Sequence, residues 1–167
     1  PISGALSHKD NMGNKRSIDV GEVQVMSSGT GLTHSEFNDS KTDAVNFLQL
    51  WIIPEVENVT PYYNQKMFDK VGRKNQFQTL VSPKDKQVKG SLSMHQQGYI
   101  LMIDLDENFE TEYNLKNGAY FFLIDGAVSV ADENLEKRDA IGILETAKVS
   151  IKASTQSKLL VIDIPMK

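Results

Sequence analysis

Short apolar segments separated by turn residues recur along the whole chain. The segments are rich in Val, Ile, Leu, Phe and Tyr, and the turns between them contain Gly, Asn and Asp. This alternation is typical of the strands of an all-β sandwich or barrel. Helical periodicity is weak, and only residues 62–71, which follow Pro61, favour a short helix. The clearest predicted strands are residues 47–53, 99–105, 119–124, 127–130, 140–144 and 159–164.

A repeat in the sequence predicts two lobes. Residues 3–26 and 125–144 both contain a Gly-Ala step, a short apolar segment, a polar turn, an Asp and a second apolar segment. An internal duplication explains this likeness. Residues 61–89 are more polar and contain prolines, so they are interpreted as the connection between a first lobe at residues 1–60 and a second lobe at residues 90–167.

The sequence GEVQVMSSGTGLTHSE at residues 21–36 ends in a histidine and a carboxylate two positions apart. Positions i and i+2 of a strand face the same side, so His34 and Glu36 in an extended segment direct an imidazole and a carboxylate toward one point. On a helix the same spacing sends the two side chains in nearly opposite directions. Such a pair can supply half of the donors of a transition-metal site. The alternative is a surface pair that only hydrogen-bonds a turn.

Composition and charge exclude several classes of function. The net charge is −4, and the basic residues are spread among acidic ones, which disfavours nucleic acid and anionic membranes as partners. No cysteine is present, so disulfides, thiolate nucleophiles and cysteine-type zinc sites are excluded, and a cytoplasmic location is expected. The apolar runs are too short to span a bilayer, and residues 1–10 have no basic segment followed by an apolar one.

The motifs resemble those of one known family. GEVQVMSSGTGLTHSEFN, followed by FLQLWIIP, resembles the pirin family of the cupin superfamily closely. SLSMHQQG at residues 91–98, the Asp125-Gly126 step and DIP at residues 163–165 are similar to the second half of the same family. The resemblance covers nearly the whole chain and implies two tandem cupin β-barrels of the jelly-roll type.

The resemblance also implies a metal site in the first barrel. Pirins hold one iron with three histidines and one glutamate, and His34 and Glu36 match the later His-x-Glu pair of that set. The other two histidines belong to a motif whose last residue matches Gly4, so they are expected upstream of Pro1. The first barrel is therefore expected to be incomplete at its N-terminus, and Fe(II) or another divalent transition metal to bind this chain alone weakly or not at all. To explain the two absent histidines, a missing or separate N-terminal segment is favoured over a site that has lost its ability to bind metal.

The implied activity is that of a quercetin 2,3-dioxygenase, which opens the central ring of a flavonol with dioxygen and releases carbon monoxide. Glu36 would then bind the metal and also take the flavonol hydroxyl proton, whereas His34 would only ligate. In the predicted strand at residues 47–53, Phe47, Gln49 and Trp51 share one face and are candidates for the wall of the substrate pocket. Trp51 is, by type, more often a core residue than a pocket residue.

Two other functions remain open. Members of the pirin family also act as regulatory partners of transcription factors or metabolic enzymes, so a non-enzymatic bicupin with a protein partner is the alternative. A seed-storage or sugar-isomerase cupin is disfavoured by the close HSEF and FLQLW match. Two barrels in one chain cover each other's exposed faces, so a monomer is expected.

The remaining histidines are not expected to bind metal. His8 is expected to be exposed or to cap a turn, and His95 to support the lobe interface or a strand end. In the second lobe, the positions that correspond to the first metal motif fall near Tyr113, Leu115 and Ala119, none of which is a good ligand. The second barrel is therefore interpreted as a structural or partner-binding unit without metal.

Overall fold

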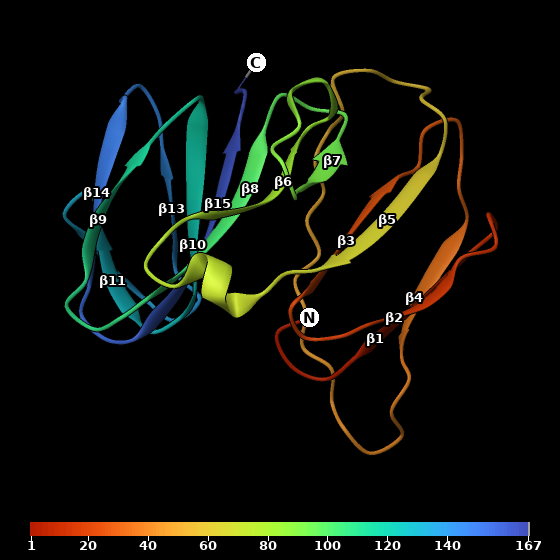
Figure 1. The fold of residues 1–167 in the computed structure, drawn as a ribbon, viewed down its shortest axis with the longest axis horizontal. Coiled ribbons are helices and arrows are strands. Elements are labelled where there is room, and N and C mark those ends of the chain that lie inside the picture. Colours follow the sequence, from red (N-terminus) through yellow and green to blue (C-terminus); the bar gives the residue numbers. More distant parts are fainter. Residues whose placement is uncertain (167) are drawn as a thin grey trace. The chain divides into compact units, whose positions relative to one another are not determined.

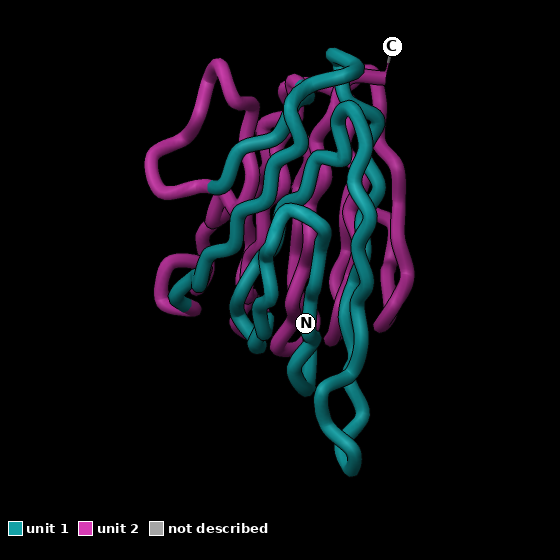
Figure 2. Tube along the Cα trace, turned by 90° about the vertical axis from the view of Figure 1, so that its right-hand side faces the viewer, with its two compact units in different colours: residues 1–69, 92–96 teal, residues 70–91, 97–167 magenta. Residues whose placement is uncertain are grey.

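The computed structural model describes residues 1–166, and these are built almost entirely of β-strands (Figure 1). They form two compact units, one of residues 1–69 and 92–96 and the other of residues 70–91 and the chain from Gln97 on (Figure 2). The only helices among the described residues are two short 3-10 helices, η1 (Lys70–Arg73) and η2 (Lys84–Lys86), both in the second unit. Neither they nor any other described element forms a helix of the length and hydrophobicity needed to cross a membrane.

The first unit contains two antiparallel sheets. The first sheet has the order β2-β1-β4, and the second pairs β3 with β5; β7 lies beside β3 and β5 (Figure 1). Turns of Gly, Asn and Asp residues connect the first four strands, as the sequence predicts. The strands are β1 (Leu6–Asp10), β2 (Lys15–Ile18), β3 (Glu22–Ser27), β4 (His34–Asn38), β5 (Tyr62–Met67) and β7 (Leu92–Met94).

The second unit also contains two antiparallel sheets. Within this unit one sheet has the order β13-β10-β15-β8-β6 and the other the order β12-β11-β14-β9. The strands are β6 (Gln78–Pro83), β8 (Tyr99–Leu105), β9 (Glu110–Asn114), β10 (Gly118–Asp125), β11 (Ala127–Val130), β12 (Glu133–Glu136), β13 (Ala140–Ile143), β14 (Lys148–Ala153) and β15 (Ser157–Ile164).

The interiors of the two units differ in chemistry. In the second unit, alternate residues of the strands point inward and form one apolar core, with Phe121, Leu123 and Leu159 fully buried. In the first unit, the buried side chains of β1 include a histidine and an aspartate as well as a leucine. Buried ionisable groups cost stability unless they are hydrogen-bonded, and His8 and Asp10 hydrogen-bond each other in an interior that also contains apolar residues such as Ile18 and Phe68.

Two of the predicted elements are wrong. Residues 47–53 form no strand, because their pairing with the start of the chain ends at the single bridge between Ser3 and Asn46, and a strand needs a continuous backbone partner. Residues 62–67 form strand β5 and not a helix, because β3 offers that partner along the whole segment. The helical turn begins only at Lys70.

Candidate functional site

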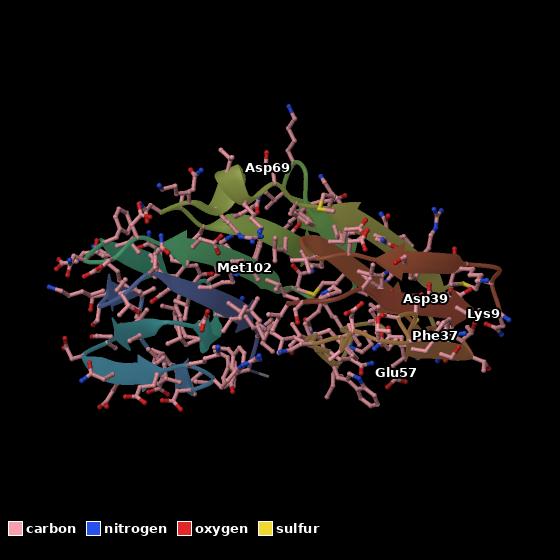
Figure 3. All side chains as sticks on the ribbon, turned by 90° about the horizontal axis from the view of Figure 1, so that it is seen from below. Lys9, Phe37, Asp39, Glu57, Asp69 and Met102 are labelled. Carbon is pink, nitrogen blue, oxygen red and sulfur yellow. The ribbon has the colours of Figure 1, made fainter. Side chains whose placement is uncertain are left out.

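The pairing of β1 with β4 brings four ionisable side chains to one face of a sheet. Glu36 lies directly opposite His8 and His34 directly opposite Asp10, and residues opposite each other in an antiparallel pair share a face. Lys9 and Phe37, which are labelled in Figure 3, alternate with these residues along the two strands and lie on the other face, where both are exposed. The face that bears the four ionisable groups is called the acidic-histidine face below.

Glu36 points into the first unit. Its side chain is 14% exposed, and the amide nitrogen Nε2 of Gln24 on β3 donates a hydrogen bond of 2.7 Å to its Oε1. His8 Nδ1 lies 3.8 Å from the same oxygen. Glu36 Oε2 has no hydrogen-bond partner among residues 1–166, so one carboxylate oxygen is held and the other is available.

His34 lies next to this carboxylate at the exposed edge of the same face. Its imidazole stacks on that of His8, with 5.8 Å between the ring centroids. The residue is exposed, and within the described chain neither ring nitrogen makes a hydrogen bond. Both nitrogens are therefore available to an external group.

His8 is not exposed and does not cap a turn, contrary to the sequence-based expectation. Its side chain is completely buried, with Nε2 3.2 Å from Asp10 Oδ2 and its ring stacked on that of Tyr63 at 4.6 Å between centroids. The reason is the pairing with β4 and the cover provided by β5, neither of which the sequence of β1 reveals. His8 Nδ1 is buried without a hydrogen-bond partner and faces Glu36.

Asp10 fixes the orientation of His8. Its carboxylate accepts hydrogen bonds from the backbone nitrogens of Met12 and Asn14 and from the Asn14 side-chain amide, at 2.7 to 3.0 Å. Burial alone would raise the pKa of Asp10, but the hydrogen bonds from Asn14, His8 and Met12 outweigh it and lower the pKa to about 2. Because the ionised carboxylate only accepts hydrogen bonds, His8 Nε2 carries the hydrogen between them.

The β3-β5 sheet supplies polar groups that face the acidic-histidine face. Tyr63 and Gln65 are two residues apart on β5, and the Tyr63 hydroxyl donates to Gln65 Oε1 at 2.8 Å. Gln65 in turn donates from Nε2 to the backbone oxygen of Ser17 on β2 at 2.7 Å. Burial, as the largest effect, raises the pKa of Tyr63 to about 12, so this hydroxyl keeps its proton at neutral pH.

The predicted pocket residues do not lie in a strand. Phe47 is half-buried and Gln49 exposed, while Trp51 is 89% exposed, so in residues 1–166 the segment does not form an enclosed wall. His95 follows β7 and lies at a strand end, where Nδ1 is 3.1 Å from the hydroxyl of Ser27 at the end of β3.

His34 and Glu36 fit a divalent metal as two of its donors. They offer the imidazole and carboxylate that such ions accept, on one face, with ring nitrogens and a carboxylate oxygen that have no other partner within the described chain. The described residues do not supply a whole site, because they include no group of three or more His, Cys, Asp or Glu side chains placed to hold a metal ion.

Sequence reasoning missed His8, Asp10, Gln24 and Tyr63. One signal was present: in the segment LSHKD, Leu6, His8 and Asp10 alternate with Ser7 and Lys9, so a buried Leu6 would place His8 and Asp10 on the buried face. The contacts of Gln24 and Tyr63 carry no such signal, because they depend on how the two sheets of the first unit face each other.

Comparison with known families gives two matches. Residues 2–52 match the family described as Pirin, and residues 79–164 match the family described as Quercetinase C-terminal cupin domain. The first match includes every residue of the acidic-histidine face. The second includes the apolar core of the second unit.

Individual relatives cover nearly the whole chain. A protein from Escherichia coli (strain K12) named quercetin 2,3-dioxygenase is 34% identical over 166 residues, which are 98% of this chain and 70% of that protein. The crystal structure of YhhW from Escherichia coli matches with a TM-score of 0.91 at 32% identity, over 98% of this chain and 68% of the other. The structure of bacterial pirin YhhW in complex with nickel(II) from Escherichia coli matches with a TM-score of 0.89 at 30% identity, over 98% of this chain and 69% of the other. These matches confirm the expected all-β fold of two cupin units.

Proposed function

Since this chain belongs to the pirin family, we propose that its first unit contributes to the divalent-metal centre of a quercetin 2,3-dioxygenase, with Fe(II) as the metal. The observation that carries the proposal is the pairing of an inward-facing Glu36 with an adjacent, uncommitted His34 on one face of β4. The relative bound to nickel(II) supports a divalent metal in this fold.

The remaining donors are proposed to be two histidines that precede Pro1. The comparison proteins extend beyond this chain, which spans 70% of the Escherichia coli quercetin 2,3-dioxygenase. An imidazole and a carboxylate alone are too few donors to offset the hydration of a divalent ion, so we expect tight binding only when further nitrogens join His34 and Glu36.

Each side chain of the site has a distinct role in this proposal. When bound, a divalent metal supplies a Lewis acid with coordination positions for a chelating substrate and dioxygen. His34 binds through a ring nitrogen. Glu36 binds through its uncommitted oxygen and accepts the proton of the flavonol hydroxyl, which is the step that readies the substrate for oxidation. Phe47, Gln49 and Trp51 are proposed to contact the flat aromatic substrate in the complete protein.

The substitution Glu36→Gln in the full-length protein tests this proposal. It removes the charge and the proton acceptor while keeping the shape, so we expect metal content to fall and oxygen uptake with quercetin to be abolished. Glu57→Gln, in an exposed loop of the first unit (Figure 3), is the matched control and should change neither.

The same measurements separate the two functions that the sequence left open. Full activity of the Glu36→Gln protein would refute the role of Glu36. A wild-type protein that binds one metal ion but consumes no oxygen with quercetin would contradict the dioxygenase proposal. That result would favour the regulatory, partner-binding alternative.

A further inference from the structure

Glu36 is held by a single side-chain hydrogen bond among residues 1–166. Gln24 Nε2 donates to Glu36 Oε1 at 2.7 Å, whereas His8 Nδ1, at 3.8 Å, is too distant to hydrogen-bond that oxygen. The orientation of the carboxylate therefore depends on one amide, on a strand of the opposite sheet.

The other end of the same amide has no partner. Gln24 Oε1 is buried and makes no hydrogen bond, and turning the amide over would place this oxygen against Glu36 Oε1. A buried, unsatisfied acceptor costs free energy, so an apolar residue of similar size would serve packing better at this position. The amide is thus poorly explained by stability and well explained by its hydrogen bond to Glu36.

We propose that Gln24 is a positioning residue for the metal centre: it holds Oε1 of Glu36 so that Oε2 faces the metal and the substrate. This inference rests on the proposed function of Glu36. Groups that orient a metal ligand through a hydrogen bond typically change metal affinity when they are removed, because the free ligand then samples unproductive orientations.

Gln65 provides a matched control within the same sheet. It lies directly opposite Gln24 in the β3-β5 pair and on the same face, but its amide donates to the backbone of Ser17 and makes no hydrogen bond with Glu36. Replacing Gln24 by leucine removes one partly buried hydrogen bond from the first unit, and replacing Gln65 by leucine removes two, the exposed one to Ser17 and the one from the Tyr63 hydroxyl. Only the change at Gln24 releases the Glu36 carboxylate.

The experiment compares Gln24→Leu, Gln65→Leu and Glu36→Gln in the full-length protein loaded with Co(II). The readouts are Co(II) affinity from competition with a chelator and the visible absorption bands of the bound ion, which report the geometry of its ligands. We expect Gln24→Leu to weaken Co(II) binding by about 10-fold and to shift the absorption bands, since outer-shell partners of metal ligands commonly contribute 10- to 100-fold. Gln65→Leu should leave both readouts at the wild-type values.

A second variant, Gln24→Asn, keeps the test possible if the leucine substitution prevents folding. If Gln24→Leu does not fold, Gln24→Asn keeps the amide but withdraws it from Glu36 by one methylene group, and the same loss of affinity is expected. Wild-type affinity and spectrum in either folded Gln24 variant would overturn the positioning role. A loss of equal size in Gln65→Leu would also overturn it.

The Glu36→Gln protein separates this inference from the proposed function. If Glu36→Gln weakens Co(II) binding and Gln24→Leu does not, only the positioning role fails. If Glu36→Gln itself binds Co(II) like the wild type, Glu36 is not a ligand, and both the proposed metal centre and the role of Gln24 are refuted.

Discussion

At the scale of single residues, the second unit also contains a buried charged side chain. Asp163 on β15 is completely buried, and its Oδ2 accepts hydrogen bonds from the Tyr113 hydroxyl at 2.9 Å and the Lys116 backbone nitrogen at 2.8 Å. Burial, followed by the charge of Asp163 and the hydrogen bond to it, raises the pKa of Tyr113. Both donors contact the same oxygen, and within residues 1–166 the other oxygen, Oδ1, is buried without a hydrogen-bond partner.

The substitution Tyr113→Phe should therefore destabilise the protein. It removes one of two donors from a buried carboxylate, so we expect urea denaturation at pH 7 to show a loss of about 1–3 kcal/mol in the free energy of unfolding. Tyr120→Phe, at an exposed site on β10, is the control and should be neutral. Equal stability of the Tyr113→Phe and wild-type proteins would show that the hydrogen bond contributes nothing.

The effect of Tyr113→Phe should depend on pH in one direction. A tyrosine whose pKa is raised in the folded state contributes its full stability below its ordinary pKa of 10, where it is neutral in both states. Above pH 10 the unfolded chain begins to lose this proton while the folded protein keeps it. The wild type should therefore lose its advantage over Tyr113→Phe as pH rises above 10, and a gap that widens instead would contradict the assignment.

At the scale of elements, the turn between β3 and β4 joins Gln24 to Glu36. Gly29 in this turn has φ of +52°, and a Cβ atom there would lie 1.9 Å from the backbone oxygen of Val59. Thr30 donates its backbone N–H to that same oxygen at 3.0 Å. The absence of a side chain at Gly29 thus allows the turn to pack against Val59.

The substitution Gly29→Ala should cost more than the same change in an open turn. We expect a loss of about 2 kcal/mol or more in the free energy of unfolding, from backbone strain and from the displacement of Val59. Gly13→Ala is the control, because Gly13 has φ of +94° but a Cβ atom added there would meet no other atom within 4 Å. Thermal unfolding of both variants checks this, and an equal loss would show that the contact with Val59 is unimportant.

The sequence predicted elements best where local pattern and final pairing agree. Residues 99–105 and 127–130 correspond to β8 and β11, because an apolar strand inside an apolar core is evident from its own residues. The spacing of His34 and Glu36 likewise placed them on one face. Residues 47–53 look equally apolar, yet Trp51 and Ile53 are 89% and 85% exposed. The pattern shows that a segment is suited to a strand, but not whether a partner strand is present.

At the scale of the whole molecule, one unit has a continuous apolar core, and the other buries ionisable side chains beside apolar ones such as Ile18 and Phe68. The second unit buries a continuous set of aliphatic and aromatic side chains, whereas the first buries His8 and Asp10 beside the half-buried Glu36. A metal ion that binds His34 and Glu36 of the folded first unit, and not the unfolded chain, stabilises that unit. The stability of the first unit should therefore depend on metal and that of the second should not.

Hydrogen exchange of the full-length protein, with and without Co(II), tests this dependence. We expect the amides of β8, β10 and β15 to be the most protected in both conditions, since each of these strands pairs on two sides next to the apolar core. Co(II) at about 100 times its Kd should add about 2.7 kcal/mol of protection to β1 and β4. An equal gain in β10 and β15 would mean that the ion binds elsewhere or that the two units open together. No gain in β4 would show that His34 and Glu36 do not bind it.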